Sequence, residues 1–235
     1  MDLFYPPICE VCQEILTDGR ALCDSCSADL PRLTAPFCQI CGEPFQGAID
    51  DTFSCPNCRN LRLSFDFARP ATARDKRTMD MIHGLKYERK IHLAPDLGRL
   101  AAEAFSDPRL ASALAGKWPI IPVPLHRRRF HHRHFNQAEE ISRELSNITG
   151  LPILKALRRI RNTEHQTTLA RAQRLENLRG AFAVTRKGRR HVSHSPVGAV
   201  LVDDVFTTGS TVEECAKTLR RAGMRNIVVV TVMRG

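Results

Sequence analysis

The chain has 235 residues, a formal net charge of +10, and 43% hydrophobic but only 6% aromatic residues. This length fits one α/β domain of about 150–180 residues plus a small module, with enough apolar content for a core. The low aromatic content argues against an aromatic-rich binding face. The positive charge favours polyanionic partners, either nucleic acid or a phosphate-rich substrate.

Cysteines and apolar runs indicate where the protein works. The first 26 residues carry acids and four cysteines instead of an apolar segment, so no secretory signal is expected. The longest apolar run, Ile227 to Met233, is far too short to span a membrane. We therefore expect a cytoplasmic protein with no transmembrane segment, in which paired cysteines hold metal in preference to disulfides.

Residues 1–62 are expected to form a double zinc ribbon. Two C-x-x-C turns supply the four thiolates of one tetrahedral zinc ion, so four such turns predict two structural Zn²⁺ sites. The simplest assignment is sequential, although an interleaved pairing or disulfides stay open from spacing alone. The predicted ligands are Cys9, Cys12, Cys23 and Cys26 in one site, and Cys38, Cys41, Cys55 and Cys58 in the other.

The segment from residue 63 onwards is expected to form an α/β domain. After a linker near Arg59 to Ala73, a short helix is predicted through M-I-H-G-L-K-Y at 81–87. A second helix follows Pro95 and ends at Asp107-Pro108. Residues 118–124 then read as a strand that stops in a proline-stiffened turn.

A basic cluster, residues 126–134, follows this strand. It contains four arginines and four histidines, and Asn136 is a good N-cap for the next helix. Clustered arginines would repel a metal cation, so phosphate, pyrophosphate, a single-stranded DNA backbone or plain solvent is the better partner. The carboxyl ends of strands are also where open α/β sheets bind ligands.

The next stretch is basic and polar. Residues 162–172 read as a long polar loop that closes over a site, or else as an ordinary surface loop. A strand is predicted at 181–184 and a basic turn at 187–194. Another buried strand is predicted at 226–233, after a helix that ends at Gly223.

The most informative stretch is P-V-G-A-V-L-V-D-D-V-F-T-T-G-S-T at 196–211. An apolar strand leads into Asp203 and Asp204, then into a loop of small hydroxyl-bearing residues and an amphipathic helix. The loop residues are Thr207, Thr208, Gly209, Ser210 and Thr211. The helix N-terminus favours a phosphate, and a nucleotide P-loop is excluded because the loop has no lysine. Two carboxylates beside a phosphate site suit a ribose 5-phosphate. Cys215, on the apolar face of this helix, is expected to be a core residue.

This stretch closely resembles the phosphoribosyl pyrophosphate (PRPP) signature of type I phosphoribosyltransferases. The whole chain resembles the ComF/GntX family of competence and DNA-utilisation proteins. The resemblance rests on the cysteine pairs, H-G-L-K-Y at 83–87, P-V-P-L-H-R-R-R at 122–129, F-N-Q-A at 135–138 and L-A-R-A-Q-R-L-E-N-L-R-G-A-F at 169–182. One departure is His134, where the family usually has glycine. If that glycine adopts a positive φ, histidine is tolerated there only with strain.

The resemblance implies a doubly wound, mostly parallel sheet of phosphoribosyltransferase type over residues 63–235. It implies that Asp203 and Asp204 bind the ribose hydroxyls in a catalytic role, and that residues 207–211 hold the 5-phosphate. Arg127, Arg129 and Arg133 would face pyrophosphate or a DNA backbone. Mg²⁺ would accompany PRPP.

Two functions stay open. We favour a PRPP-binding protein of DNA uptake that contacts single-stranded DNA, and other DNA-uptake proteins at the inner face of the membrane. The alternative is an active phosphoribosyltransferase in nucleobase or nucleotide metabolism, in which an unidentified nitrogen nucleophile displaces pyrophosphate. The sequence leaves open whether the protein is an enzyme.

Overall fold

The computed structural model describes residues 7–45, 47, 53–59, 61–162, 176–195 and 197–235. The strands are β1 Phe67–Thr72, β2 Ile120–Pro122, β3 Leu157–Arg159, β4 Phe182–Val184, β5 Gly198–Phe206 and β6 Asn226–Arg234. The helices are α1 Asp24–Ala28, α2 Lys76–Tyr87, α3 Ala94–Ala102, α4 Ala111–Ala115, α5 Arg127–Arg133, α6 Gln137–Thr149, α8 Arg186–His194 and α9 Ser210–Arg221. Short 3-10 turns are η1 Ile91–Leu93, η2 Glu103–Ser106 and η3 Pro108–Leu110.

A four-stranded parallel sheet forms the centre, in the order β1-β6-β5-β2. Strands β5 and β6 are the long central pair, in register from Gly198 opposite Asn226 to Phe206 opposite Arg234. Strands β3 and β4 form a separate antiparallel pair. The expected α/β class with a parallel sheet is confirmed.

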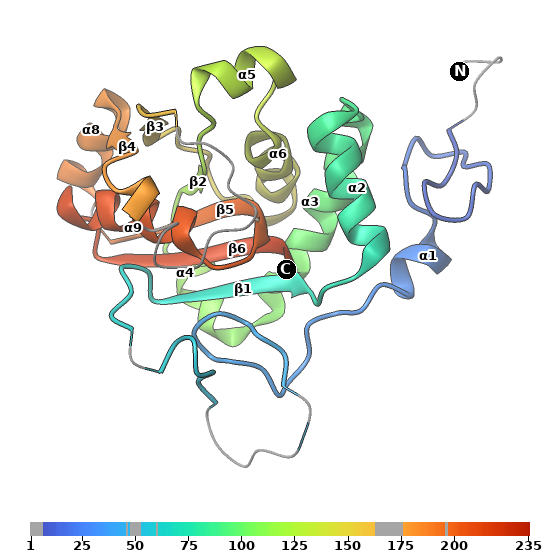
Figure 1. The fold of residues 1–235 in the computed structure, drawn as a ribbon, viewed down its shortest axis with the longest axis horizontal. Coiled ribbons are helices and arrows are strands. Elements are labelled where there is room, and N and C mark those ends of the chain that lie inside the picture. Colours follow the sequence, from blue (N-terminus) through green and yellow to red (C-terminus); the bar gives the residue numbers. More distant parts are fainter. Residues whose placement is uncertain (1–6, 46, 48–52, 60, 163–175, 196) are drawn as a thin grey trace.

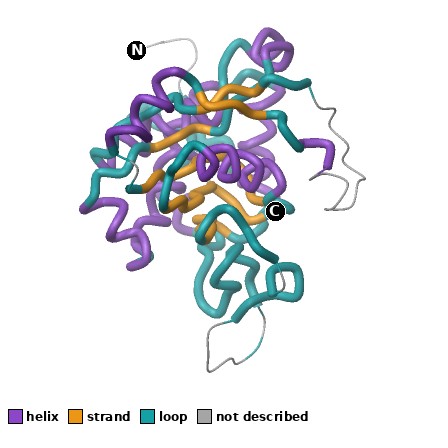
Figure 2. The backbone as a smooth tube through the Cα atoms, turned by 90° about the vertical axis from the view of Figure 1, so that its left-hand side faces the viewer, coloured by secondary structure: helices purple, strands orange, loops and turns teal. Residues whose placement is uncertain are grey.

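Helices cover both faces of the sheet, because successive strand residues point to opposite sides. Val200 and Val202 of β5 join the core beneath α3 and α6, whereas Ala199 and Leu201 join the core beneath α9. All four side chains are fully buried. Figure 2 shows helices on either side of the strands. The continuous apolar run in β5 is therefore explained by burial on two faces.

The cysteine-rich module packs along β1, the edge strand of the sheet. Backbone hydrogen bonds run from Leu33 N to Ala71 O at 2.9 Å and from Ala68 N to Ile40 O at 2.7 Å. In Figure 1 the first cysteine segment lies beside α2, and the second lies below β1. The expected boundary between residues 62 and 63 falls just before β1. The module protects an edge that would otherwise offer unpaired backbone groups.

Three local expectations were wrong. Residues 67–72 form β1, although the sequence placed them in a linker. Residues 127–133 form helix α5 within the basic cluster, where no helix was expected. Residues 186–194 form helix α8, where a basic turn was expected at 187–194. The side chains of His126 and Thr185 cap these helices by accepting from Arg128 N and Gly188 N. Among the described residues, no helix combines the length and apolarity needed to cross a bilayer.

Candidate functional site

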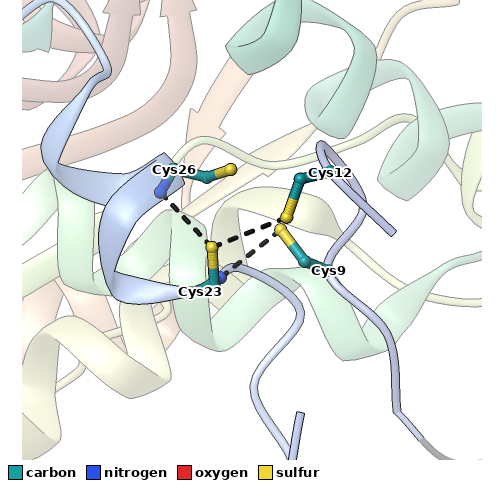
Figure 3. Close-up of side chains that lie close together, drawn as sticks. All are labelled: Cys9, Cys12, Cys23 and Cys26. Atoms are coloured by element: carbon teal, nitrogen blue, oxygen red, sulfur yellow. Dashed lines mark hydrogen bonds between the residues drawn. The ribbon is translucent and has the colours of Figure 1, made fainter. Parts of the chain in front are cut away.

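The eight paired cysteines form two compact clusters, grouped sequentially. In each cluster the four sulfur atoms lie within 4.8 Å of one another. Figure 3 shows the first cluster, Cys9, Cys12, Cys23 and Cys26, with its sulfurs converging. The second cluster is Cys38, Cys41, Cys55 and Cys58. All nine cysteines of the chain are free thiols, so disulfides do not account for the pairs.

The geometry of both clusters fits zinc. A zinc ion about 2.3 Å from each sulfur holds tetrahedral neighbours about 3.8 Å apart. The Sγ atoms of Cys12 and Cys23 are 3.7 Å apart, and those of Cys41 and Cys55 are 3.6 Å apart. Backbone N–H groups also donate to sulfur, as from Cys26 N to Cys23 Sγ at 3.3 Å. The two clusters are structural zinc sites that leave no open coordination position.

The acidic pair lies near the carboxyl end of β5. Asp204 is 4% exposed, and its Oδ1 accepts from Lys86 Nζ at 2.7 Å. Its Oδ2 is buried and has no hydrogen-bond partner among the described residues. The backbone N–H of Asp204 donates to Asp203 Oδ1 at 2.9 Å. A buried carboxylate oxygen without a donor is costly, so it marks a place for a ligand donor.

Asp203 holds its proton more tightly than an ordinary aspartate. Burial, followed by the neighbouring charge of Asp204, raises its pKa from 3.8 to about 7, against the opposing effects of Lys86 and Arg159. The negative charge of Asp204 thus adds to burial in disfavouring the ionised form of Asp203. A carboxyl with a pKa near neutrality at the end of a strand is typical of a functional site.

Helix α9 begins directly in the loop after β5. Gly209 is the N-cap residue, with φ of +75° and no side-chain cap among the described residues. A Cβ there would lie 2.6 Å from the ring of Phe206, so glycine is required both by conformation and by space. Thr208 and Ser210 are joined through their hydroxyls at 2.9 Å. Backbone N–H groups, hydroxyls and a helix dipole converge here, which suits an anion.

Arg234, on β6, supports this loop from below. Its Nη1 donates to the carbonyl oxygens of Phe206 at 2.8 Å and Thr207 at 2.9 Å. Its guanidinium also lies 5.5 Å from the centre of the Phe206 ring and pairs with Glu43, next to the second cysteine cluster. The loop is thus tied to the end of the sheet and to the zinc module.

The basic cluster begins beside the acidic pair because β2 and β5 are neighbours. Val123 N donates to Val202 O at 2.9 Å, and Asn136 both caps α6 and donates to Val123 O at 3.0 Å. On α5, Arg127 is exposed and Arg129 half-buried. Arg133 is only 6% exposed, stacks on Tyr87 and donates to Gln137. The structure thus gives Arg133 an interior, supporting position.

Two charged residues of this region were not assigned a role from the sequence. Lys86 comes from α2, 118 residues before its partner Asp204. Arg159 comes from β3. Its positive charge lowers the pKa of Asp203, and the nearby positive charge of Arg129 lowers the pKa of Arg159. Burial is the main cause that lowers the pKa of Arg159. Only the position of H-G-L-K-Y within the family resemblance hinted at Lys86.

Comparison with known proteins places this geometry in a family. Residues 1–59 match the double zinc ribbon domain. The chain is 31% identical over 218 residues to competence protein F of Haemophilus influenzae, covering 89% of each chain. It is also 31% identical over 242 residues to DNA utilization protein YhgH of Escherichia coli K12, covering 99% of each. The chain belongs to the ComF/GntX family. Competence protein ComFC of Bacillus subtilis is a more distant relative, at 22% identity over 223 residues.

The family departure at His134 has a structural consequence. This residue ends α5 in the left-handed region, with φ of +66°. The position therefore does need a positive φ, as the usual family glycine suggested. In this ComF/GntX protein a residue with a Cβ atom adopts the left-handed conformation at this position, which costs backbone strain energy.

Two further predictions concern other parts of the chain. Cys215 is fully buried on α9, which confirms its expected core position, and burial raises the pKa of its thiol. The polar loop predicted at 162–172 lies outside the described residues, apart from residue 162.

Proposed function

We propose that the β5–α9 site binds the ribose 5-phosphate part of PRPP, and that the protein acts in uptake or utilisation of exogenous DNA. The observation that carries the first part is Asp204. Its carboxylate is buried beside a helix N-terminus, with one oxygen bound by Lys86 and the other without a donor. A sugar hydroxyl would satisfy that oxygen, and its 5-phosphate would reach the backbone N–H groups of residues 209–211.

Each part of PRPP has a chemically matched counterpart in this assignment. Asp203 and Asp204 accept from the ribose hydroxyls. The hydroxyls of Thr208 and Ser210 add donors at the phosphate. The pyrophosphate, with Mg²⁺ bound to its oxygens, extends towards Arg127 and Arg129 on α5. Arg133 stabilises α5 from inside and has a supporting role.

PRPP binding is tested by calorimetry with PRPP and Mg²⁺. We expect saturable binding to the wild type and a loss of about tenfold or more in Asp204→Asn, because a charge-assisted hydrogen bond is replaced by a mismatched amide. Asp80→Asn removes an exposed carboxylate from α2 and is the matched control. Wild-type protein that binds no PRPP overturns the assignment.

The DNA role is supported by the relatives, whose names refer to competence and DNA utilisation. It is also supported by two exposed basic helices, α5 and α8. Arg186, Arg189 and Arg190 of α8 are exposed, as are Arg127 and Arg128 of α5. Such side chains bind a phosphate backbone without reading sequence. The thiolate zinc sites favour a reducing compartment, so we place this activity in the cytoplasm, beside other DNA-uptake proteins at the membrane.

Single-strand binding is tested by measuring affinity against salt concentration. Each phosphate contact contributes about −0.7 to the slope of log K against log salt. Replacing Arg186, Arg189 and Arg190 by glutamine should flatten the slope by about 2 units. Replacing Lys76 and Arg221, which lie away from α5 and α8 in the sequence, should change it less. A wild-type slope near zero contradicts phosphate contacts.

An active phosphoribosyltransferase is the second candidate, favoured by the near-neutral pKa of Asp203. A group with such a pKa is suited to accept a proton from an incoming nitrogen nucleophile. Pyrophosphate release from PRPP in the presence of a panel of nucleobases and amines tests this activity. Release that depends on an added acceptor and is lost in Asp203→Asn supports it.

A further inference from the structure

Two exposed aromatic side chains lie where helices α2 and α5 meet. Among the described residues, the aromatic rings in the exposed hydrophobic set are Phe45, Tyr87 and Phe130. Tyr87 is the last residue of α2 and is 57% exposed, and Phe130 is in the middle of α5 and is 45% exposed. The two segments are joined by a hydrogen bond from Arg89 Nη2 to His132 O at 3.1 Å. Although only 6% of the residues are aromatic, exposed rings are therefore concentrated in one place.

The ring of Tyr87 is held in a fixed orientation. The guanidinium of Arg133 lies 5.0 Å from its centre, and the ring of His83 meets it at 82°, with the two centroids 5.6 Å apart. Arg133 is itself buried and donates to Gln137 Oε1 at 3.1 Å. These contacts cover only part of Tyr87, since more than half of the residue stays exposed. A ring that is both oriented and exposed loses little conformational freedom when another flat ring stacks on it.

Phe130 extends this surface along α5. It precedes Arg133 by three residues, so both side chains project from the same side of the helix. Because Tyr87 contacts Arg133, that side of α5 is also the side that faces the end of α2. We call the surface formed by Tyr87 and Phe130 the aromatic platform.

Cationic side chains surround the aromatic platform. Helix α5 contains four arginines and two histidines and no acidic residue. Arg128 is exposed on this helix, and Arg89 is exposed two residues after Tyr87. Aromatic rings that stack on bases, beside cations that follow a phosphate backbone, are the two components of sites for single-stranded nucleic acid. A free nucleobase would leave the arginines unused, and the base faces of a duplex are already covered by stacking. An unpaired strand uses both components.

We propose that Tyr87 and Phe130 stack on unpaired bases of single-stranded DNA, while Arg89 and Arg128 hold the adjoining phosphates. This inference rests on the proposed contact with single-stranded DNA and adds the place where its bases are bound. It also distinguishes the two basic helices. Helix α8, with the sequence R-K-G-R-R-H-V-S-H, contains no Phe, Tyr or Trp and supplies charge only.

The test measures the affinity for two strands of equal length, an oligothymidylate and a strand of abasic deoxyribose phosphates. Both carry the same phosphates, so the difference between them reports base contacts. The variants are Tyr87→Leu, Phe130→Leu and Tyr87→Phe, with Phe45→Leu as the matched control. Phe45 is an exposed ring in the second cysteine segment below β1, whereas α5 lies at the top of the view in Figure 1. Melting temperatures verify that each variant is folded, and the comparison of strands needs only the wild type.

We expect the wild type to bind the thymidylate strand about tenfold or more tightly than the abasic strand, the effect of one or two stacked bases. Tyr87→Leu and Phe130→Leu should each lose about fivefold or more in affinity, for the thymidylate strand only. Their slope of log K against log salt should not change, because the phosphate contacts remain. Tyr87→Phe and Phe45→Leu should leave both affinities unchanged.

Arg128→Gln provides the complementary variant. It should weaken the binding of both strands and flatten the salt slope by about 0.7, because it removes one phosphate contact and no base contact. Loss of affinity without a change of slope in the leucine variants, and with a change of slope in Arg128→Gln, would distinguish stacking from charge.

The outcomes separate the two proposals. If the wild type binds neither strand, the DNA contact itself is wrong. If the wild type binds both strands equally, the aromatic platform does not hold bases, and the phosphate contacts of the DNA role stand. Leucine variants that weaken both strands to the same extent would also overturn stacking, since the rings would then only support α5. Competition by free thymidine monophosphate as strong as that by the strand would contradict a strand as the occupant.

Discussion

Asp203 links the acidity of the site to the stability of the fold. Its folded pKa of about 7 lies above the ordinary value of 3.8. Between these values the native protein holds a proton that the unfolded chain has lost, so stability falls as the pH rises through this window. The cost is fully present above pH 7 and absent below about pH 4. An ionised Asp203 therefore costs stability in return for a strong acceptor.

Replacing Asp203 by asparagine should remove this cost. We expect a gain of about 1–2 kcal/mol at pH 8 and about a third of that gain at pH 5, because the cost builds up between the unfolded and the folded pKa. Urea unfolding at both pH values measures the difference. A gain of equal size at pH 5 and pH 8, or a loss at pH 8, would contradict a raised pKa at this residue.

His134 offers a second test at a single residue. Its φ of +66° strains a side chain that glycine would lack. His134→Gly should stabilise the protein by about 0.5–1 kcal/mol. This gain is the backbone strain that is relieved, minus the extra conformational entropy that glycine gives the unfolded chain.

Gly150 provides the matched control. It ends α6 with φ of +70°, and a Cβ there meets no atom within 4 Å. Gly150→Ala should therefore destabilise by a similar amount, through the backbone alone. Equal effects of the same sign would exclude this explanation.

At the level of elements, the loop between β5 and α9 depends on β6. Arg234 is 8% exposed and donates to two carbonyl groups of the loop. Arg234→Met should cost about 2–3 kcal/mol, since buried carbonyls lose a charged donor. Its partner Glu43 has a side chain that is 41% exposed, so Glu43→Gln should cost less than about 1 kcal/mol. Denaturant unfolding measures the loss of unfolding free energy in both variants. A larger loss in Glu43→Gln than in Arg234→Met would contradict a supporting role of Arg234 through the loop carbonyls.

Elements were predictable where one local pattern sufficed. Strands β5 and β6 are continuous apolar runs, and helices α3, α6 and α9 have regular apolar stripes, so their sequences specify them. Strand β1 was missed because Arg69 and Pro70 interrupt its pattern. Both are accommodated by tertiary structure: Arg69 pairs with Asp107 and donates to Leu33 O, and Pro70 lies on an edge strand.

The residues of the site also fall into those that a local sequence pattern predicts and those that depend on tertiary packing. Asp203, Asp204 and residues 207–211 are contiguous, so a strand followed by a loop and a helix was enough to propose them. The zinc ligands were legible because C-x-x-C turns fix two sulfurs locally. Lys86 could not be derived, since its position depends on how α2 packs against the sheet. The interior position of Arg133 depends in the same way on Tyr87 and Gln137.

At the scale of the whole molecule, the two zinc sites differ in how they belong to the fold. The second cluster is entirely buried and shares a core with Leu201 and Val229 of the sheet. The first has Cys12 exposed and Cys26 half-buried. Its Cys9 and Cys23 also share a core with Val200 of the sheet, and polar contacts such as Ala21 N to Asp96 Oδ2 at 2.7 Å add to this attachment, so the exposure of Cys12 is what distinguishes the first site. Access of a chelator should therefore differ between them.

We expect zinc to leave in two steps when a chelator is added. The first site should release its ion early, because exposed thiolates can be attacked without opening the core. The second should release only as the domain unfolds, since its sulfurs pack against the sheet.

Trp118 is the single tryptophan, and its ring lies against Gly198 at the start of β5, so its fluorescence reports on the sheet. Zinc release is followed with a chromogenic chelator while the fluorescence of Trp118 is recorded. The first ion should be released without a change in fluorescence (the silent step), and the second should be released together with a change in fluorescence. Cys12→Ser should abolish only the silent step. Release of both ions in one step would mean that the first cluster is as deeply tied to the domain core as the second.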